Sequence, residues 1–240
     1  MPARKKDQAP VRDVAKRTLR GRKAYIVPTE RNANGFVAGE SFLERNHLLL
    51  LSTQVGITRL WDQSVCIDLD NETLVDRLAD LPKRGGKTAR RYTADSSYEC
   101  ADGRRGVCES KPRAFLDQHA EKHALAGKVL DKYGRSFITL TEEHFSPVFI
   151  SNLENLLKAT SEGQRHHAEV AIAKLHQALG QQERWLTVEL KQSANLSNAD
   201  IFFGLAHGVL RADLRQSLFN NSSWVEAAHG SLDHLIFEAL

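Results

Sequence analysis

Two acidic residues and a lysine occur at spacings that could hold a divalent cation beside a reactive water. Asp95 opens one expected strand, and Glu109 and Lys111 stand two residues apart at the end of the next. Side chains alternate between the faces of a strand, so Glu109 and Lys111 share a face while Ser110 points to the other. Carboxylate oxygens are ligands that Mg²⁺ prefers, and a neighbouring ammonium can steer a water. This short pattern is common, so the surrounding elements have to support it.

The turn between these two strands decides whether Asp95 shares the face of Glu109 and Lys111. That arrangement requires Asp95 to lie opposite residue 109 or 111. It therefore needs an odd number of loop residues, for example a three-residue loop at 102–104. A two-residue turn would pair Asp95 with Ser110 and turn Glu109 away, unless a bulge corrected the register.

A helix expected from Gly39 onward could add a third carboxylate. Glu40, Glu44 and His47 lie at i, i+4 and i+7 and so share one side of that helix. The simpler alternative is that these polar groups only face solvent.

Basic residues are concentrated in the half of the chain that holds this pattern. Residues 1–113 contain 22 Lys and Arg against 15 Asp and Glu, a balance of +7, whereas residues 114–240 contain 11 against 15, a balance of −4. A polyanion is the natural partner of the first half and a protein that of the second. Residues 1–23 form a basic arm that would add salt-sensitive phosphate affinity, unless they are only a solvated tail.

A basic loop at 82–87 precedes Asp95, and its glycines let the backbone approach a phosphate. If that polyanion is DNA, the side chains that we expect to contact it are Lys83, Arg84, Lys87, Arg90, Arg91, Arg104, Arg105 and Arg113.

The composition indicates a globular protein without a membrane segment. The chain has 240 residues, 41% of them hydrophobic, which is enough for a substantial core. No apolar run is long enough to cross a bilayer, and no apolar segment follows the basic N-terminus as in a signal peptide. Cys66, Cys100 and Cys108 form no Cys-x-x-Cys pair and suit a reducing compartment. We therefore expect a cytoplasmic protein. If the hairpin loop has an odd number of residues, Cys100 and Cys108 point to the sheet face opposite Glu109, which we expect to face the core.

Hydrophobic periodicity predicts an α/β domain followed by a mainly helical one. Before residue 143 we expect strands at 57–60, 65–67 and 137–141, a helical turn at 73–81, and a helix from 112 to about 132. His119 and His123 are spaced to bind zinc, but no third ligand is near, so surface histidines are favoured. After residue 143 we expect helices at 147–158, capped by Ser146-Pro147, and at 164–179, 184–191, 201–207 and 224–240.

Four segments stand in order along the chain. They are residues 42–47 before the leucine run, Trp61-Asp62-Gln63-Ser64-Val65, Tyr92-Thr93-Ala94-Asp95 and Cys108-Glu109-Ser110-Lys111-Pro112. Together they resemble the TnsA endonuclease subunit of heteromeric transposases, within the PD-(D/E)XK nuclease superfamily. The resemblance covers most of residues 25–220 and implies a mixed sheet flanked by helices at 24–143. Residues 201–214 also resemble the winged-helix C-terminal domain of that family, here at 144–240.

This resemblance implies a reaction and a set of site residues. The reaction is Mg²⁺-dependent hydrolysis of a DNA phosphodiester at the 5′ ends of a transposon, with Mn²⁺ able to substitute. Glu44, Asp95 and Glu109 would hold the ion, and the Ser110 carbonyl would complete its coordination sphere. Lys111 would orient or help activate the attacking water. Glu40 is a rival to Glu44 because it shares the same helix face, and Gln63 matches a family glutamine whose expected role is to support the sheet.

The same resemblance implies a prokaryotic, nucleoid-associated protein with three partners. They are double-stranded DNA at the transposon ends, a TnsB-like transposase that cuts and joins the 3′ ends, and a TnsC-like ATP-dependent regulator that docks on the C-terminal domain.

Two alternatives stay open. One is a stand-alone restriction or repair nuclease of the same fold, and the other is a non-catalytic winged-helix protein that binds or bridges DNA. Ala94 and Ser96 support the second alternative, because a proline and a bulky apolar residue usually flank the family aspartate. Ser110 is a further departure, since an apolar residue commonly stands there.

Overall fold

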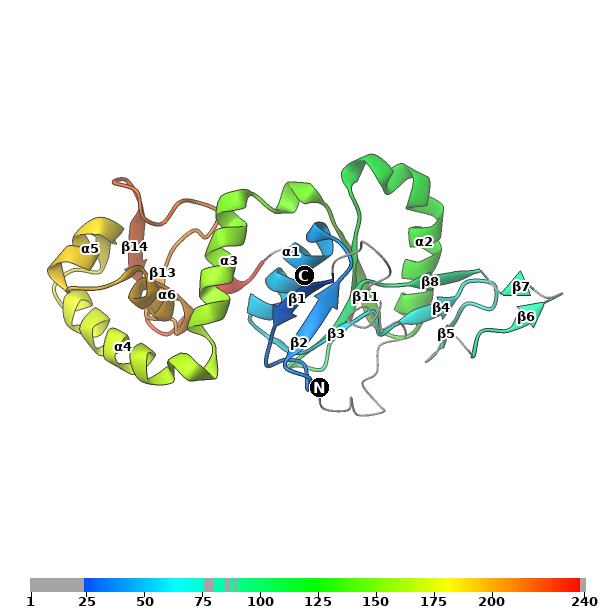
Figure 1. Cartoon of the computed structure of the whole chain (residues 1–240), viewed down its shortest axis with the longest axis horizontal. Helices are drawn as coiled ribbons and strands as arrows, with labels where there is room; N and C mark the ends of the chain where they lie inside the picture. The colour runs from blue at the N-terminus through cyan, green and yellow to red at the C-terminus, as the bar shows by residue number, and fades with distance from the viewer. Residues whose placement is uncertain (1–23, 76–79, 85–86, 89, 238–240) are drawn as a thin grey trace. The chain divides into compact units, whose positions relative to one another are not determined.

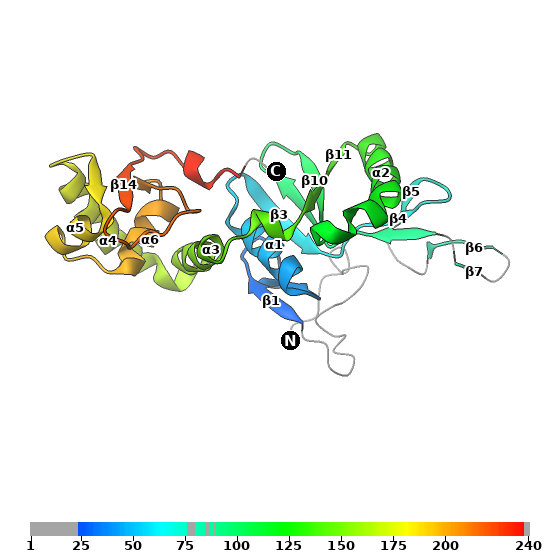
Figure 2. The ribbon, with the colours of Figure 1, turned by 90° about the horizontal axis from the view of Figure 1, so that it is seen from above.

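The structure is a computed structural model that describes residues 24–75, 80–84, 87–88 and 90–237. The chain forms two compact units (Figure 1, Figure 2). Among the described residues, the first comprises residues 24–52 and 56–144, and the second comprises Thr53–Val55 and residues 145–237. The domain boundary predicted from the sequence lies between residues 143 and 144. The basic arm expected at 1–23 lies outside the described residues.

A four-stranded mixed sheet forms the centre of the first unit. Its strands are β3 (Ile57–Asp62), β9 (Ser96–Cys100), β10 (Arg105–Ser110) and β11 (Arg135–Leu140), in the spatial order β11-β10-β9-β3. β9 runs antiparallel to β3 and β10, whereas β10 and β11 run parallel. A parallel pair requires a crossover, and the helix α2 (Leu116–Lys132) supplies it.

Two helices cover opposite faces of this sheet. The helix α1 (Phe42–Thr53) reaches Ser110 of β10 through a hydrogen bond from His47. The helix α2 shares a hydrophobic cluster with Val107 of β10. Val107 and Ser110 are three positions apart on one strand and therefore point to opposite faces. The predicted mixed sheet flanked by helices is thus confirmed. The buried members of the cluster are Val65, Ile67, Leu69, Tyr92, Ala94, Val107, Ala126, Val129 and Leu130.

Smaller sheets extend the first unit. β1 (Tyr25–Pro28) pairs with β2 (Phe36–Gly39), β4 (Cys66–Asp68) pairs with β5 (Thr73–Val75) and β8 (Arg91–Thr93), and β6 (Lys83–Arg84) pairs with β7 (Lys87–Thr88). The helical turn predicted at 73–81 is wrong for residues 73–75. The β-branched Thr73 and Val75 favour an extended chain, and pairing with β4 fixes it. Residues 76–79 lie outside the described part of the chain.

The second unit combines helices with a three-stranded antiparallel sheet. Its helices are α3 (Pro147–Ala159), α4 (Arg165–Leu179), α5 (Thr187–Ser193) and α6 (Asn198–Ala206). Its strands are β12 (Arg184–Leu186), β13 (Leu210–Arg211) and β14 (Trp224–Ala227), in the order β12-β14-β13. The Ser146 hydroxyl accepts a hydrogen bond from the Phe149 amide, so the predicted N-cap is confirmed.

Two helix predictions in this unit are wrong. The helix predicted at 224–240 is absent over its described part, where Trp224–Ala227 forms a strand between two others and Asp233–Leu235 forms a single 3-10 turn. The segment 184–191 begins as the strand β12 and becomes helical only at Thr187. In both places, pairing between residues far apart in the chain overrides local helical periodicity. No helix among the described residues has the length and apolar character needed to cross a membrane.

Candidate functional site

The β9–β10 register places Asp95 opposite Glu109. Glu99 pairs with Arg105 and Ser96 with Cys108, and one further step brings residue 95 to residue 109. A loop of three residues, 101–103, connects the strands, and the Cys100 amide closes it by donating to the Arg104 carbonyl at 2.8 Å. The odd loop length required for a shared face is therefore present, one residue earlier in the chain than the 102–104 example.

Asp95 is fixed by contacts with both neighbouring segments. Its Oδ2 accepts a hydrogen bond from the Ser110 amide at 2.7 Å. Its carbonyl accepts another from the Gln63 amide at 2.9 Å, so Gln63 supports the sheet through its backbone. The Gln63 Oε1 is buried and has no hydrogen-bond partner among the described residues.

Glu109 is the most enclosed acid of the site, with 5% of its surface exposed. The Tyr92 hydroxyl donates to its Oε2 at 2.7 Å. Its Oε1 lies 3.2 Å from Lys111 Nζ and 3.7 Å from His123 Nε2. Burial and the negative charge of Glu109 raise the pKa of Tyr92 well above its ordinary value, so the phenol stays protonated as a donor.

Tyr92 and His123 are site residues that the sequence reasoning missed. His123 is buried against Tyr92 and Phe137, not on the surface as predicted, and burial lowers its pKa. A signal was present, because His123 shares its helical stripe with Leu116 and Leu130 and an apolar stripe normally faces the core.

Glu44 caps the helix that carries it. Its Oε1 accepts from the Ser41 hydroxyl at 2.9 Å, and its Oε2 accepts from the Glu40 amide at 2.8 Å. The Ser41 hydroxyl in turn accepts from the Glu44 amide at 3.1 Å. These bonds resemble a capping box, in which Ser and Glu three residues apart satisfy free amides at a helix start. The rival Glu40 contributes its backbone amide to this arrangement.

The three acids are electrostatically connected. Burial raises the pKa of Asp95 well above its ordinary value, and the charges of Glu109 and Glu44 raise it further. Burial also raises the pKa of Glu44, with smaller contributions from Glu40 and Glu109. Buried carboxylates that repel one another gain stability from a bound cation, and such shifted values are typical of functional sites.

The donor set fits a magnesium ion that keeps part of its water shell. Within the described ranges, no three His, Cys, Asp or Glu side chains are grouped so that they could hold a metal. Mg²⁺ is commonly bound by one or two carboxylates, with waters and substrate oxygens as the other ligands. Asp95, Glu109 and the Ser110 carbonyl meet that requirement by their chemistry.

His47 lies on the opposite face of the same two strands. It is fully buried, and its ring nitrogens contact the hydroxyls of Ser110 and Ser96 at 2.6 Å and 2.8 Å. Burial lowers the pKa of His47 to about 3, so the imidazole is neutral at physiological pH.

The structure describes the expected DNA-contacting residues to different extents. Lys83, Arg84 and Lys87 belong to the β6–β7 hairpin by their backbone, and their side chains are outside the described part of the structure. Arg91 is exposed on β8. Four exposed arginines form surface ion pairs: Arg90 with Asp70 (2.9 Å), Arg104 with Asp102 (2.7 Å), Arg105 with Glu99 (3.2 Å), and Arg113 with Glu143. Water and salt screen exposed pairs of this kind, so they contribute little to stability and a phosphate can replace the carboxylate at little cost.

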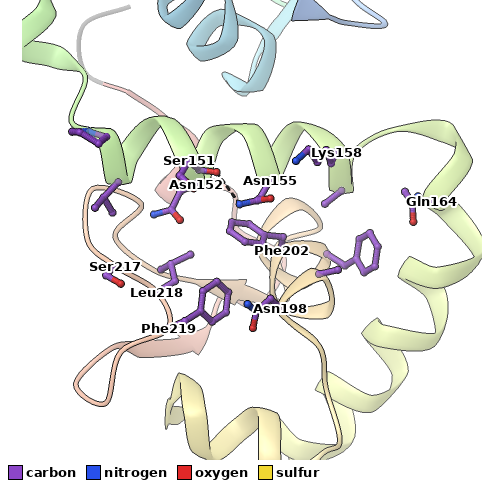
Figure 3. Close-up of a pocket in the computed structure, with 15 residues that line it drawn as sticks. Ser151, Asn152, Asn155, Lys158, Gln164, Asn198, Phe202, Ser217, Leu218 and Phe219 are labelled. Atoms are coloured by element: carbon purple, nitrogen blue, oxygen red, sulfur yellow. Dashed lines mark hydrogen bonds between the residues drawn. The ribbon is translucent and has the colours of Figure 1, made fainter.

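The second unit contains a cavity of about 720 Å³ beside α3 and α6 (Figure 3). Phe202, Leu218 and Phe219 give it an apolar wall, and Asn152 holds the neighbouring loop by donating to the Leu214 carbonyl at 2.8 Å. Lys158 is its one ionisable lining residue among those described. The lining suits a protein or peptide contact better than acid–base chemistry.

No model of a known protein family matches the chain, and no curated protein matches it.

Proposed function

We propose that this protein is a metal-dependent DNA endonuclease, the subunit of a transposase that hydrolyses the phosphodiester at the 5′ ends of a transposon. The observation that carries the proposal is the β9–β10 register, which sets Asp95 opposite Glu109 when it is continued by one residue beyond Ser96 and Cys108. Lys111 Nζ lies 3.2 Å from Glu109 Oε1. Two acids can hold a metal ion that activates water and stabilises charge on a phosphodiester, and a lysine beside them can orient that water.

The order of elements supports a PD-(D/E)XK fold. A helix with an acid, α1, precedes the strands β3 and β9, and Asp95 stands just before β9. Glu109-x-Lys111 follows at the end of β10, and then come the helix α2 and the strand β11 parallel to β10. This is the order in which that superfamily presents its site.

Each residue has a role that follows from its contacts. Asp95, Glu109 and the Ser110 carbonyl would hold Mg²⁺ or Mn²⁺, with Glu44 as the third acid. The metal, when bound, lowers the pKa of water and stabilises charge on the phosphate. Lys111 orients the attacking water and stabilises the developing negative charge. Tyr92 keeps Glu109 in place by donating to the oxygen that faces away from Lys111.

The second unit supports the transposase assignment. Its order from α4 onward is helix, strand, two helices, strand, loop and strand, with β14 between β12 and β13. That order is similar to a winged helix, with residues 212–223 as the wing. We propose that this unit, with its acidic balance and apolar cavity, docks the TnsC-like ATP-dependent regulator. The basic unit would bind DNA beside the TnsB-like transposase.

A non-catalytic DNA-bridging role is the second candidate. The observation that favours it is the engagement of both Glu44 oxygens in helix capping, which draws that acid away from metal binding.

A cleavage assay separates these candidates. Duplex DNA carrying the transposon end is incubated with Mg²⁺ or Mn²⁺ and the accompanying transposition proteins, and 5′-strand breaks are counted. The enzyme proposal requires cleavage by the wild type and its loss in Asp95→Ala, Glu109→Ala and Lys111→Ala. Glu44→Ala tests whether Glu44 also contributes to cleavage. Uncut 5′ ends with the wild-type protein would favour the bridging role.

A further inference from the structure

We propose that His47 is a positioning residue of this site, and that it acts by joining the two strands that present the acids to the helix that carries Glu44. The inference rests on the proposed function, since it concerns the same site. It assigns a role to a buried side chain that lies on the face of the sheet opposite Glu109.

Each ring nitrogen of His47 has a serine hydroxyl as its partner. Nδ1 lies 2.6 Å from the Ser110 hydroxyl, and Nε2 lies 2.8 Å from the Ser96 hydroxyl. A neutral imidazole has one N–H donor and one acceptor nitrogen, so one serine accepts from the ring and the other donates to it. All three side chains are buried, with 0–7% of their surface exposed. The imidazole therefore satisfies two buried hydroxyls that water does not reach.

The two serines are joined directly to the reacting groups. Ser96 follows Asp95 in the chain. Ser110 stands between Glu109 and Lys111, and its amide donates to Asp95 Oδ2 at 2.7 Å. A shift of Ser110 would therefore move the hydrogen bond to Asp95, the carbonyl proposed as a metal ligand and the direction of both flanking side chains. His47 controls that shift because it is the hydrogen-bond partner that the structure gives to the Ser110 hydroxyl.

His47 also sets the distance between the helix and the strands. It lies on the same helix as Glu44, three residues later, so the side chains leave that helix from neighbouring positions. The bond to Ser110 fixes α1 against β10, and the bond to Ser96 fixes it against β9. Partners of metal ligands that orient them in this way typically change metal affinity by about 10–100-fold when removed.

The test compares four variants in the full chain. His47→Leu removes both bonds and leaves two buried hydroxyls without a partner. The triple variant His47→Leu/Ser96→Ala/Ser110→Ala removes the hydroxyls as well. It therefore leaves no buried polar group without a partner, but it does not restore the hydrogen bonds between the helix and the two strands. His47→Gln keeps one donor and one acceptor. Ser52→Ala is the control, because Ser52 is a buried residue of the same helix whose hydroxyl has no hydrogen-bond partner among the described residues.

Two readouts distinguish positioning from simple stability. The first is hydrogen exchange of the Ser110 amide in the metal-free protein, and the second is Mn²⁺ affinity. We expect exchange protection at Ser110 to fall by about tenfold in His47→Leu and in the triple variant, even though the triple variant regains thermal stability. Mn²⁺ affinity should fall by about tenfold in both, with partial rescue in His47→Gln and no change in Ser52→Ala.

Unchanged Ser110 exchange in His47→Leu, or full recovery of that exchange in the triple variant, would overturn the positioning role. If the wild type binds no Mn²⁺ at Asp95, the proposed function fails. The exchange of the Ser110 amide then still decides the role of His47, because it requires no metal.

Discussion

Asp95 lies opposite Glu109 across the β9–β10 hairpin, and its carboxylate accepts a hydrogen bond from the amide that follows Glu109 in the chain. The two acids are thereby linked through the backbone of one strand. Burial, and then the charges of Glu109 and Glu44, raise the pKa of Asp95. Because these contacts differ from residue to residue, we expect single substitutions at the site to change stability, metal affinity and cleavage to different extents.

Replacing Asp95 by Asn should stabilise the metal-free protein. The folded pKa of Asp95 is raised above its ordinary value of 3.8, so the folded state holds that proton more tightly than the unfolded state does. The stability contributed by this proton is present below the ordinary pKa and is lost as the pH rises through the folded pKa. Above the ordinary pKa the wild type therefore loses stability that Asp95→Asn keeps, because the amide carries no charge and its oxygen still accepts from Ser110.

The measurement is thermal unfolding between pH 4 and pH 8. We expect the Tm of Asp95→Asn to exceed that of the wild type by about 2–4 °C at neutral pH, the change that ~1 kcal/mol produces in a domain of this size, and by less at low pH. Saturating Mn²⁺ should reverse the order, because only the wild type gains from the ion. An Asn variant less stable than the wild type at every pH would contradict the electrostatic description.

Replacing Lys111 by Ala should abolish cleavage without weakening metal binding. The ammonium lies 3.2 Å from Glu109 Oε1, where it neutralises a charge that a metal would otherwise neutralise. Its loss should reduce the cleavage rate by at least ~100-fold, as expected for removal of a group that orients water, and leave Mn²⁺ affinity equal or higher. The control is Lys174→Ala, a lysine of the second unit. Parallel loss of cleavage and Mn²⁺ binding would instead make Lys111 a structural element of the ion site.

Replacing Tyr92 by Phe should destabilise the fold through Glu109. The hydroxyl donates to a carboxylate oxygen that is almost fully enclosed, so its removal leaves a buried charged acceptor short of one donor. Such a loss costs about 1–3 kcal/mol, with the ring itself still filling its place in the core. Urea unfolding of both proteins measures the difference, and an unchanged midpoint would show that Glu109 finds another donor.

Replacing Gly39 by Ala should disturb the start of α1 and with it Glu44. An added Cβ would lie 2.8 Å from the Glu44 Cβ, closer than real Cβ contacts allow, and 3.2 Å from the Arg45 amide nitrogen, which is a tight contact. We expect a loss of about 1–3 kcal/mol in the free energy of unfolding, as for other crowded sites. Gly163→Ala is the matched control, since nothing lies within 4 Å of the Cβ it would add. Equal stability of the two variants would mean that the helix start can move without strain.

The local parts of the fold could be predicted from the sequence. The leucine-rich stripe predicts α1, the Ser146-Pro147 pair predicts the start of α3, and the parity of the hairpin loop predicts that Asp95 and Glu109 share a face. Each depends on residues close together in the chain. The strand at Trp224–Ala227 could not be predicted in this way, because its partners are β12 and β13 and their contribution is not encoded locally.

The interior of the site was harder to predict than its acids. Ser41 and Glu44 have the spacing of a capping box, and that signal was readable before the structure. The contacts of His47 were not readable, because they join residues 49 and 63 positions apart. Ser96 and Ser110 are two of the departures from the TnsA pattern, and both bond to this one imidazole.

The central claim, a divalent metal at Asp95 and Glu109, is tested most directly by a crystal of the full chain grown with Mn²⁺ and measured for anomalous scattering. We predict one peak in contact with the Asp95 and Glu109 carboxylates and the Ser110 carbonyl, at the ~2.1 Å typical of Mg²⁺ sites. The peak should disappear in Asp95→Ala. An Mn²⁺-loaded crystal without a peak between these residues, or with its peak elsewhere, would contradict the claim.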